Sequence, residues 1–109
     1  MLASLLGSVS AERVLVFLFA RGEGYAREIA KFYNTNVTPI QRGLEKFEAN
    51  GILYSRLAGK TRLYSFNPKH PFKPEVENLL KKALNFYPPH EREMLLMNRR
   101  RPRRSGKPL

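Results

Sequence analysis

The sequence predicts a mainly α domain with one small antiparallel β-hairpin, an α+β fold class. Apolar residues recur at the helical period of about 3.6 between residues 11 and 50, and again between residues 74 and 84. Between these stretches, residues 52–57 and 61–66 are rich in aromatic and branched side chains and follow the strand period of two. The chain of 109 residues has the length of one small domain.

The first predicted helix spans residues 11–20, with Ser10 as its N-cap. It is apolar nearly all round, so we expect it to be buried on most of its sides. Three leucines among the first residues predict a short helical lead-in that covers part of the core. Two glycines directly after the helix are expected to end it.

A second predicted helix, residues 25–33, is followed by a tight turn and a third helix, which is the order of a helix-turn-helix. Arg27 and Lys31 lie on its outward side, where they are placed to touch DNA phosphates. Asn34 suits the turn, because Asn adopts left-handed backbone geometry more readily than most residues that carry a side chain.

The third predicted helix, residues 36–50, has both of its ends marked in the sequence. Asn36 is a good N-cap, since its side chain can accept a hydrogen bond from an unpaired amide of the first turn. Pro39 falls in that first turn, where no intrahelical amide bond is lost. Gly51 supplies the positive φ that a helix C-terminus often needs.

The two faces of the helix at 36–50 differ in chemistry. The face expected to be buried holds Val37, Ile40, Leu44 and Phe47. The opposite face holds Thr38, Arg42, Glu45 and Ala49, flanked by Gln41 and Lys46. This pattern suits a recognition helix in a DNA major groove, where Gln and Arg can read base edges. An ordinary amphipathic surface helix is the alternative.

On the recognition-helix interpretation, Thr38, Gln41 and Arg42 are expected to read base edges, with Pro39 near a thymine methyl group. Glu45 is expected to orient Arg42. The helix is followed by the predicted hairpin, which has a three-residue loop at 58–60.

The predicted hairpin forms a basic wing directly after the recognition helix. We expect Arg56, Lys60 and Arg62 to crowd its tip and, together with Lys46, to hold phosphates. A generic solvated hairpin, with Lys and Arg only blunting the sheet edges, is the alternative.

Residues 5–84 resemble a winged helix-turn-helix transcriptional regulator of the broad ArsR/MarR-like group. The resemblance rests on the motifs at 25–30, 40–53 and 59–68, and it is greatest to a prokaryotic subset found fused or adjacent to nucleotidyltransferase domains. It implies dimeric, sequence-specific binding of duplex DNA through the helix and the wing. Without Cys, and with only His70 and His90, the thiolate metal-sensing sites of many ArsR proteins cannot form. Asn34 also replaces the Gly that is usual in the turn.

After the DNA-binding domain, expected at residues 1–68, a proline-rich connector leads into a second segment at 69–98. Its helical stripe consists of Val76, Leu79, Leu80, Ala83 and Leu84. This stripe either packs on its own domain or pairs with the same helix of a second chain, and we expect the dimer.

The last segment, residues 99–109, has no apolar pattern and is expected to be a disordered basic tail. Its DNA-binding candidates are Arg99, Arg100, Arg101, Arg103 and Arg104. An Arg-Pro-Arg sequence can lie in a narrow A·T minor groove, while a nonspecific polycationic anchor is the alternative.

The net charge of +11 points to a polyanionic partner, nucleic acid before membrane. No catalytic constellation, cofactor motif or metal site is recognisable, so we expect no enzyme and no cofactor. The longest apolar run is too short to span a bilayer, and no signal peptide is recognisable. These features predict a cytoplasmic protein, and the resemblance to winged-helix regulators implies that it is prokaryotic and nucleoid-associated.

Together, these observations predict a sequence-specific double-stranded DNA-binding transcriptional regulator that acts as a homodimeric repressor. Two alternatives remain from the sequence. One is a nonspecific DNA-, RNA-binding or architectural protein. The other is a winged-helix adaptor or antitoxin-like module that binds a partner protein encoded elsewhere.

Overall fold

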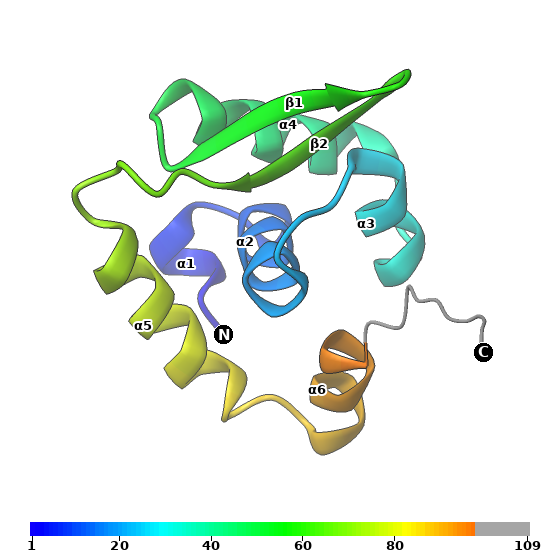
Figure 1. Ribbon diagram of the computed structural model, residues 1–109. Helices are drawn as coiled ribbons and strands as arrows, with labels where there is room; N and C mark the ends of the chain where they lie inside the picture. The colour runs from blue at the N-terminus through cyan, green and yellow to red at the C-terminus, as the bar shows by residue number, and fades with distance from the viewer. Residues whose placement is uncertain (98–109) are drawn as a thin grey trace, which may run out of the picture.

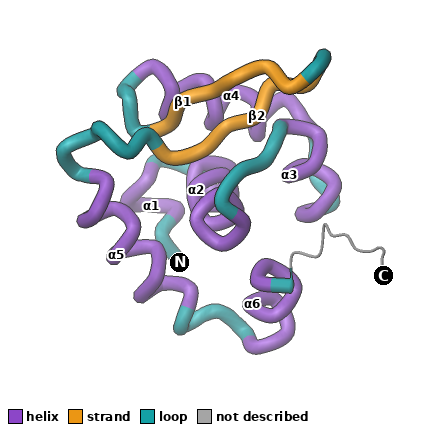
Figure 2. The backbone as a smooth tube through the Cα atoms, in the orientation of Figure 1, coloured by secondary structure: helices purple, strands orange, loops and turns teal. Residues whose placement is uncertain are grey.

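The computed structural model describes residues 1–97 of the chain. In chain order its elements are α1 (Ala3–Leu6), α2 (Val9–Arg21), α3 (Ala26–Tyr33), α4 (Val37–Ala49), β1 (Leu53–Ala58), β2 (Thr61–Phe66), α5 (Lys73–Leu84) and α6 (Pro89–Leu96). Helices therefore dominate residues 1–97, and the one sheet within this range is the antiparallel pair β1–β2 (Figures 1 and 2). The predicted class, mainly α with a hairpin after the helices, is confirmed, and the arrangement is a winged helix.

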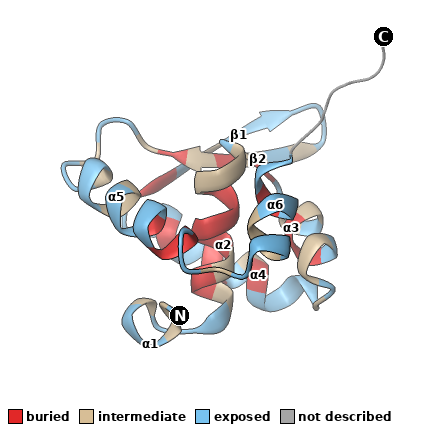
Figure 3. Cartoon of the chain, turned by 90° about the horizontal axis from the view of Figure 1, so that it is seen from below, coloured by how far each residue is buried: buried red, intermediate tan, exposed pale blue. Residues whose placement is uncertain are grey.

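Helix α2 is the centre of the core, as its all-round apolar sequence predicted. Val14, Val16, Phe17 and Leu18 are fully buried, and α1, α3, α4, α5, α6 and β2 all contact this helix. Figure 3 shows the buried residues gathered on α2 and on the sides of its neighbours. The predicted N-cap is wrong by two residues, because the Ser8 hydroxyl accepts the Ala11 amide at 3.0 Å and α2 begins at Val9.

Helix α4 follows the predicted range, and Ile40, Leu44 and Phe47 are buried as expected. Val37 is not, because it lies in the first turn at the edge of the core and remains 39% exposed. Asn36 occupies the N-cap position with an extended backbone, but its side chain makes no capping hydrogen bond. At the other end, Gly51 has φ +87°, the positive value predicted for it.

The hairpin pairs Leu53 with Phe66 and Ala58 with Thr61. Its loop therefore has two residues, Gly59 and Lys60, rather than the predicted three. Gly59 has φ +65° in the first loop position, where a tight hairpin turn favours glycine. The short loop brings the strands together almost to the tip of the wing.

The C-terminal helices pack onto the same core as the N-terminal ones. Leu80 and Leu84 of α5 and Leu95 of α6 join the cluster around α2. Arg21 ties α6 to α2, because its side chain donates to the carbonyl oxygens of Leu95 at 3.0 Å and Met94 at 2.9 Å. The predicted segment 69–98 thus has no separate core within the described residues.

This packing contradicts the prediction that the stripe of α5 forms a dimer surface, for most of its residues. Leu80, Ala83 and Leu84 are buried inside the chain, so they have almost no surface to offer a second chain. Of the stripe, only Val76, which is half-buried, and Leu79, which is 36% exposed, keep accessible surface.

Within residues 1–97, none of the helices is long and apolar enough to cross a membrane. The predicted basic tail lies outside the described residues.

Glu12 is a buried carboxylate that fastens the N-terminal residues and the α5–α6 connection to α2. It accepts from the Met1 amino group at 3.0 Å, from the Leu2 amide at 2.7 Å and from the Tyr87 hydroxyl. Burial alone would raise the pKa of Glu12, but the hydrogen bonds from Tyr87, Met1 and Leu2 outweigh burial and lower it. The carboxylate therefore stabilises the fold in its ionised form.

We expect Glu12→Gln to lower the free energy of unfolding by about 1–3 kcal/mol at neutral pH, since the amide cannot replace a carboxylate that accepts several hydrogen bonds. The folded-state pKa is depressed, so this stabilisation is complete above the ordinary value of 4.5 and is lost as the pH falls through the lower folded value. Urea unfolding between pH 7 and pH 3 measures the difference between the two proteins.

The exposed Glu93 provides the matched control, and Glu93→Gln is expected to leave stability nearly unchanged. A difference between wild type and Glu12→Gln that stayed constant down to pH 3 would contradict the role given to the carboxylate.

Candidate nucleic-acid interface

The turn between α3 and α4 has the geometry predicted for a helix-turn-helix. Asn34 adopts φ 54° and ψ 53°, the left-handed conformation, and ends α3. The Thr35 amide then donates to the Ala30 carbonyl at 3.0 Å, which closes the turn. Ile29 and Ala30 of α3 share the core with α4, so the two helices are held in a fixed relation.

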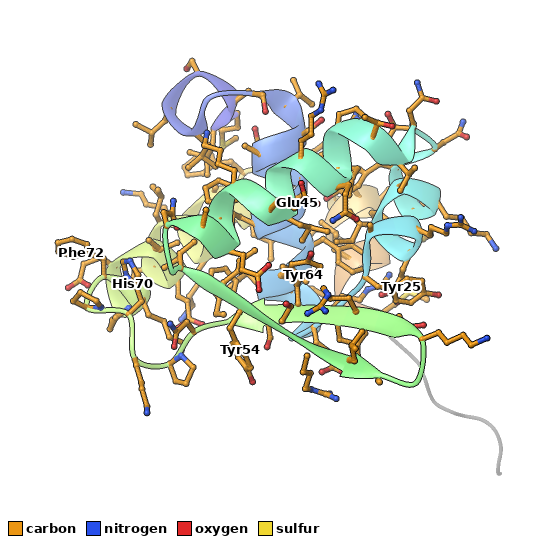
Figure 4. The ribbon with its side chains drawn as sticks, turned by 90° about the horizontal axis from the view of Figure 1, so that it is seen from above. Tyr25, Glu45, Tyr54, Tyr64, His70 and Phe72 are labelled. Atoms are coloured by element: carbon orange, nitrogen blue, oxygen red, sulfur yellow. The ribbon has the colours of Figure 1, made fainter. Side chains whose placement is uncertain are left out.

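The face of α4 opposite the core points outward, as Figure 4 shows for Glu45. Thr38, Pro39 and Arg42 are exposed along it, and Gln41 is half-buried on the side of the wing. The first turn of α4 contains no acidic residue. The predicted base-reading residues therefore lie in the N-terminal half of α4, on or beside its free face.

A hollow lies between α3, α4 and the wing, and we call it the wing-side hollow. It is lined by Tyr25, Ala26, Arg27, Gln41, Lys60, Thr61, Arg62 and Tyr64. Tyr25 and Tyr64 mark its place in Figure 4. Arg27 from α3, Lys60 from the loop and Arg62 from β2 thus line one concave surface beside Gln41. Three cations from three elements favour an anionic occupant there.

The remaining predicted phosphate contacts lie elsewhere. Lys31 is exposed on α3. Lys46 lies on the other side of α4, where its ammonium donates to the Leu6 carbonyl at 3.3 Å and shares a hollow with Thr38 and Arg42. Lys46 is therefore on the α1 side of the helix, away from the wing.

Arg56 does not join the cluster at the wing tip, which corrects the prediction for this residue. Side chains alternate across the hairpin, so Arg62 shares a face with the inward-pointing Tyr64, while Arg56 lies on the other face. There its guanidinium pairs with the Glu23 carboxylate at 2.9 Å. By contrast, Arg27, Lys31, Arg42 and Lys60 have no hydrogen bond or ion pair to a carboxylate within the described residues.

Two chains of hydrogen bonds connect α4 to the wing. The Gln41 side-chain amide donates to the Glu45 carboxylate at 3.0 Å and to the Tyr64 hydroxyl at 3.4 Å. Glu45 therefore bonds to Gln41, and the prediction that it orients Arg42 is wrong. Further along α4, the Ser55 hydroxyl donates to Glu48 at 2.6 Å and accepts from Arg62 at 2.9 Å.

The sequence reasoning missed Ser55 and Tyr64 as residues of this surface. A usable signal was present, because the strand period of two places both on the same face as the core residues Leu53 and Phe66. Polar side chains on an inward strand face need partners, and α4 supplies them. Within residues 1–97, no three His, Cys, Asp or Glu side chains gather where they could hold a metal ion.

The fold is similar to that of a double mutant of Lactococcus lactis ZitR in its apo form. The two structures superpose with a TM-score of 0.54 at 19% sequence identity, over 80% of this chain and 74% of the ZitR chain. At this identity the likeness establishes the fold alone. No family model matches the sequence, and no curated protein matches it.

The position of the wing depends on a close approach at Gly24. Its amide donates to the Tyr64 carbonyl at 3.1 Å, and its own carbonyl accepts the Tyr64 amide at 2.8 Å. A Cβ atom at Gly24 would lie only 2.8 Å from a ring carbon of the buried Phe17. The second glycine after α2 is thus required by packing between the wing and the core.

We expect Gly24→Ala to destabilise the protein by about 1–3 kcal/mol, because the methyl group overpacks the site. Chemical denaturation provides the measurement. Phe17→Leu, combined with Gly24→Ala, removes the ring that the methyl group would strike. The double variant is therefore expected to lose less free energy of unfolding than the two single variants lose together. Strictly additive losses would contradict the proposed clash.

Proposed function

We propose that the protein is a sequence-specific regulator that binds double-stranded DNA, with α4 in the major groove and the wing on the backbone beside it. The observation that carries the proposal is the pairing of two surfaces. The free face of α4 presents Thr38, Pro39 and Arg42, and the wing-side hollow next to it holds Arg27, Lys60 and Arg62. A helix that reads bases flanked by cations that hold phosphates is the arrangement such a complex needs.

Within this proposal, the residues divide between two tasks. Thr38, Gln41 and Arg42 contact base edges, and Pro39 lies near a thymine methyl group. Phosphates are held by Arg27, Lys31, Lys46, Lys60 and Arg62. Arg56 contributes less than the sequence suggested, because binding a phosphate would compete with its ion pair to Glu23.

The comparison with ZitR supports the proposal at the level of class. The fold found here is similar to that of ZitR over 80% of the chain. The excess of basic over acidic residues agrees with a DNA partner. On this proposal the protein works in the cytoplasm of a prokaryote, on nucleoid DNA, and needs no cofactor. Arg99, Arg100, Arg101, Arg103 and Arg104 add a tail contact to the DNA.

The proposed regulator acts as a homodimeric repressor. The candidate contact is the apolar surface that α5 keeps outside the core, namely Val76, Leu79 and the neighbouring Phe72, which is 63% exposed. Two recognition helices would then meet half-sites about one DNA turn apart, roughly 34 Å. Size-exclusion chromatography with light scattering tests the dimer, and a monomer would remove this part of the proposal.

Selection from a random duplex library, at one fixed salt concentration, tests the proposed function itself. Enrichment of a defined sequence is expected. Equal binding of duplex DNA, duplex RNA and single strands in competition would favour the nonspecific alternative instead. No binding to any nucleic acid, together with a monomeric state, would favour an adaptor that binds another protein.

Arg42→Ala is expected to weaken binding to the selected duplex by about 1–3 kcal/mol and to relax the base preference at one position. The reason is that a guanidinium at a base edge distinguishes guanine from the other bases. Titration of the selected duplex and of single-position variants measures the effect. Equal losses on selected and random duplexes would place Arg42 on the backbone instead.

Lys60→Ala is expected to weaken binding to all duplexes similarly and to lower the slope of log affinity against log salt by about one unit. Arg56→Ala is the matched control on the same hairpin, and its effect is expected to be smaller because Arg56 pairs with Glu23. Titrations at several salt concentrations measure both slopes. An Arg56 effect as large as that of Lys60 would contradict the assignment of Lys60 to the wing-side hollow and of Arg56 to its ion pair with Glu23.

A further inference from the structure

Gln41 is held by two side chains that leave only one of its polar atoms available. Its amide nitrogen donates to the Glu45 carboxylate at 3.0 Å and to the Tyr64 hydroxyl at 3.4 Å. A primary amide has two N–H donors and one carbonyl acceptor. Both donors are therefore used inside the protein, and the carbonyl oxygen is the group that remains.

The orientation of the amide follows from the chemistry of Glu45. An ionised carboxylate can only accept hydrogen bonds, so the nitrogen of Gln41 must face it. The reverse orientation would place the amide oxygen against a carboxylate oxygen, which is repulsive. The Tyr64 hydroxyl can either donate or accept, and so it follows the orientation that Glu45 imposes.

The second partner fixes the position of the amide. Tyr64 is only 2% exposed, and its backbone is bonded to Gly24 on one side and lies within the hairpin on the other. Its hydroxyl reaches α4 across the wing-side hollow, where Figure 4 shows Tyr64 next to the helix that carries Glu45. Gln41 is therefore held from its own helix and from the wing.

We propose that Gln41 reads DNA only as a hydrogen-bond acceptor, and that Glu45 and Tyr64 are positioning residues that set this specificity. This inference rests on the proposed DNA-binding function. A free Gln would bond to adenine through both its oxygen and its nitrogen. Held by Glu45, Gln41 instead selects a base with an amino donor in the major groove, which is adenine N6 or cytosine N4.

The experiment uses the duplex that the wild-type protein selects from a random library. The position read by Gln41 is the one at which Gln41→Ala loses its base preference. Two modified duplexes are then made at that base pair. One lacks the exocyclic amino group of the pair, and the other carries a 7-deazapurine, which lacks the N7 acceptor.

Wild-type affinity is expected to fall about fivefold without the amino group, the effect of one hydrogen bond, and to stay unchanged without N7. Gln41→Ala is expected to bind the parent and both modified duplexes alike, which controls for changes in the DNA itself. Dependence of the wild type on N7, or none on the amino group, would overturn the inference.

Glu45→Gln tests the positioning role, because a neutral amide can accept or donate and no longer fixes Gln41. This variant is expected to keep a dependence on the amino group and to gain a dependence on N7, because a released Gln41 can bond to adenine through both its oxygen and its nitrogen. Glu48→Gln is the matched control. It removes the same charge three residues further along α4, but Glu48 accepts a hydrogen bond from Ser55 and makes none with Gln41. Both variants are expected to bind all duplexes somewhat more tightly, and only Glu45→Gln to change the base readout.

The outcomes separate this inference from the function on which it rests. If no duplex is enriched in the selection, the proposed function and the inference fail together. If a duplex is enriched but Glu45→Gln keeps the wild-type response to the modified bases, only the inference fails. Tyr64→Phe gives a second test. Loss of the hydroxyl is expected to reduce the dependence on the amino group, while Glu45 still determines the orientation of the Gln41 amide.

Discussion

Helix α2 has apolar side chains on nearly all of its sides, and burying them requires a neighbour on each side. Each large apolar side chain that becomes buried contributes about 1.5–3 kcal/mol, so leaving one side of α2 open would be costly. The N-terminal helices and the wing cover only part of it, and α5 and α6 return to cover the rest. This requirement explains why Leu80, Leu84 and Leu95 are used inside the chain and not at a surface for a second copy.

The same requirement determines which face of α4 is free. Ile40 and Leu44 are fully buried, and Gly43 lets α4 approach α2 so closely that a Cβ there would lie 3.3 Å from Val14. With its inner face fixed in this way, α4 must present Thr38 and Arg42 outward. The wing is fixed separately, by the backbone pairing of Tyr64 with Gly24. The candidate interface is thus a surface built from elements that are each anchored in the core.

Much of the fold follows from sequence because hydrophobic period is a local property. The periods of 3.6 and 2 predicted α2, α3, α4 and the hairpin, and Asn34 and Gly51 adopt the backbone geometry expected of them. What could not be predicted depends on distant contacts. Whether the stripe of α5 faces α2 or a second chain is not encoded in its spacing, and neither is the meeting of Arg56 with Glu23. Gln41 and Tyr64 likewise lie 23 residues apart, and only the folded chain brings them together.

The charges of α4 are distributed unevenly along its length, and this bears on how the helix would approach DNA. Its N-terminal half carries Arg42 and no acidic side chain, whereas Glu45 and Glu48 lie in the C-terminal half. The helix dipole adds positive potential at the N-terminus and negative potential at the C-terminus. Both contributions favour the first turns of α4 over the last turns as the part that approaches a polyanion, and Lys46 is the one cation of the C-terminal half of α4. The two glutamates, each bonded to a neighbour on α4 or the wing, therefore favour the approach in which the N-terminal residues of a recognition helix meet the bases.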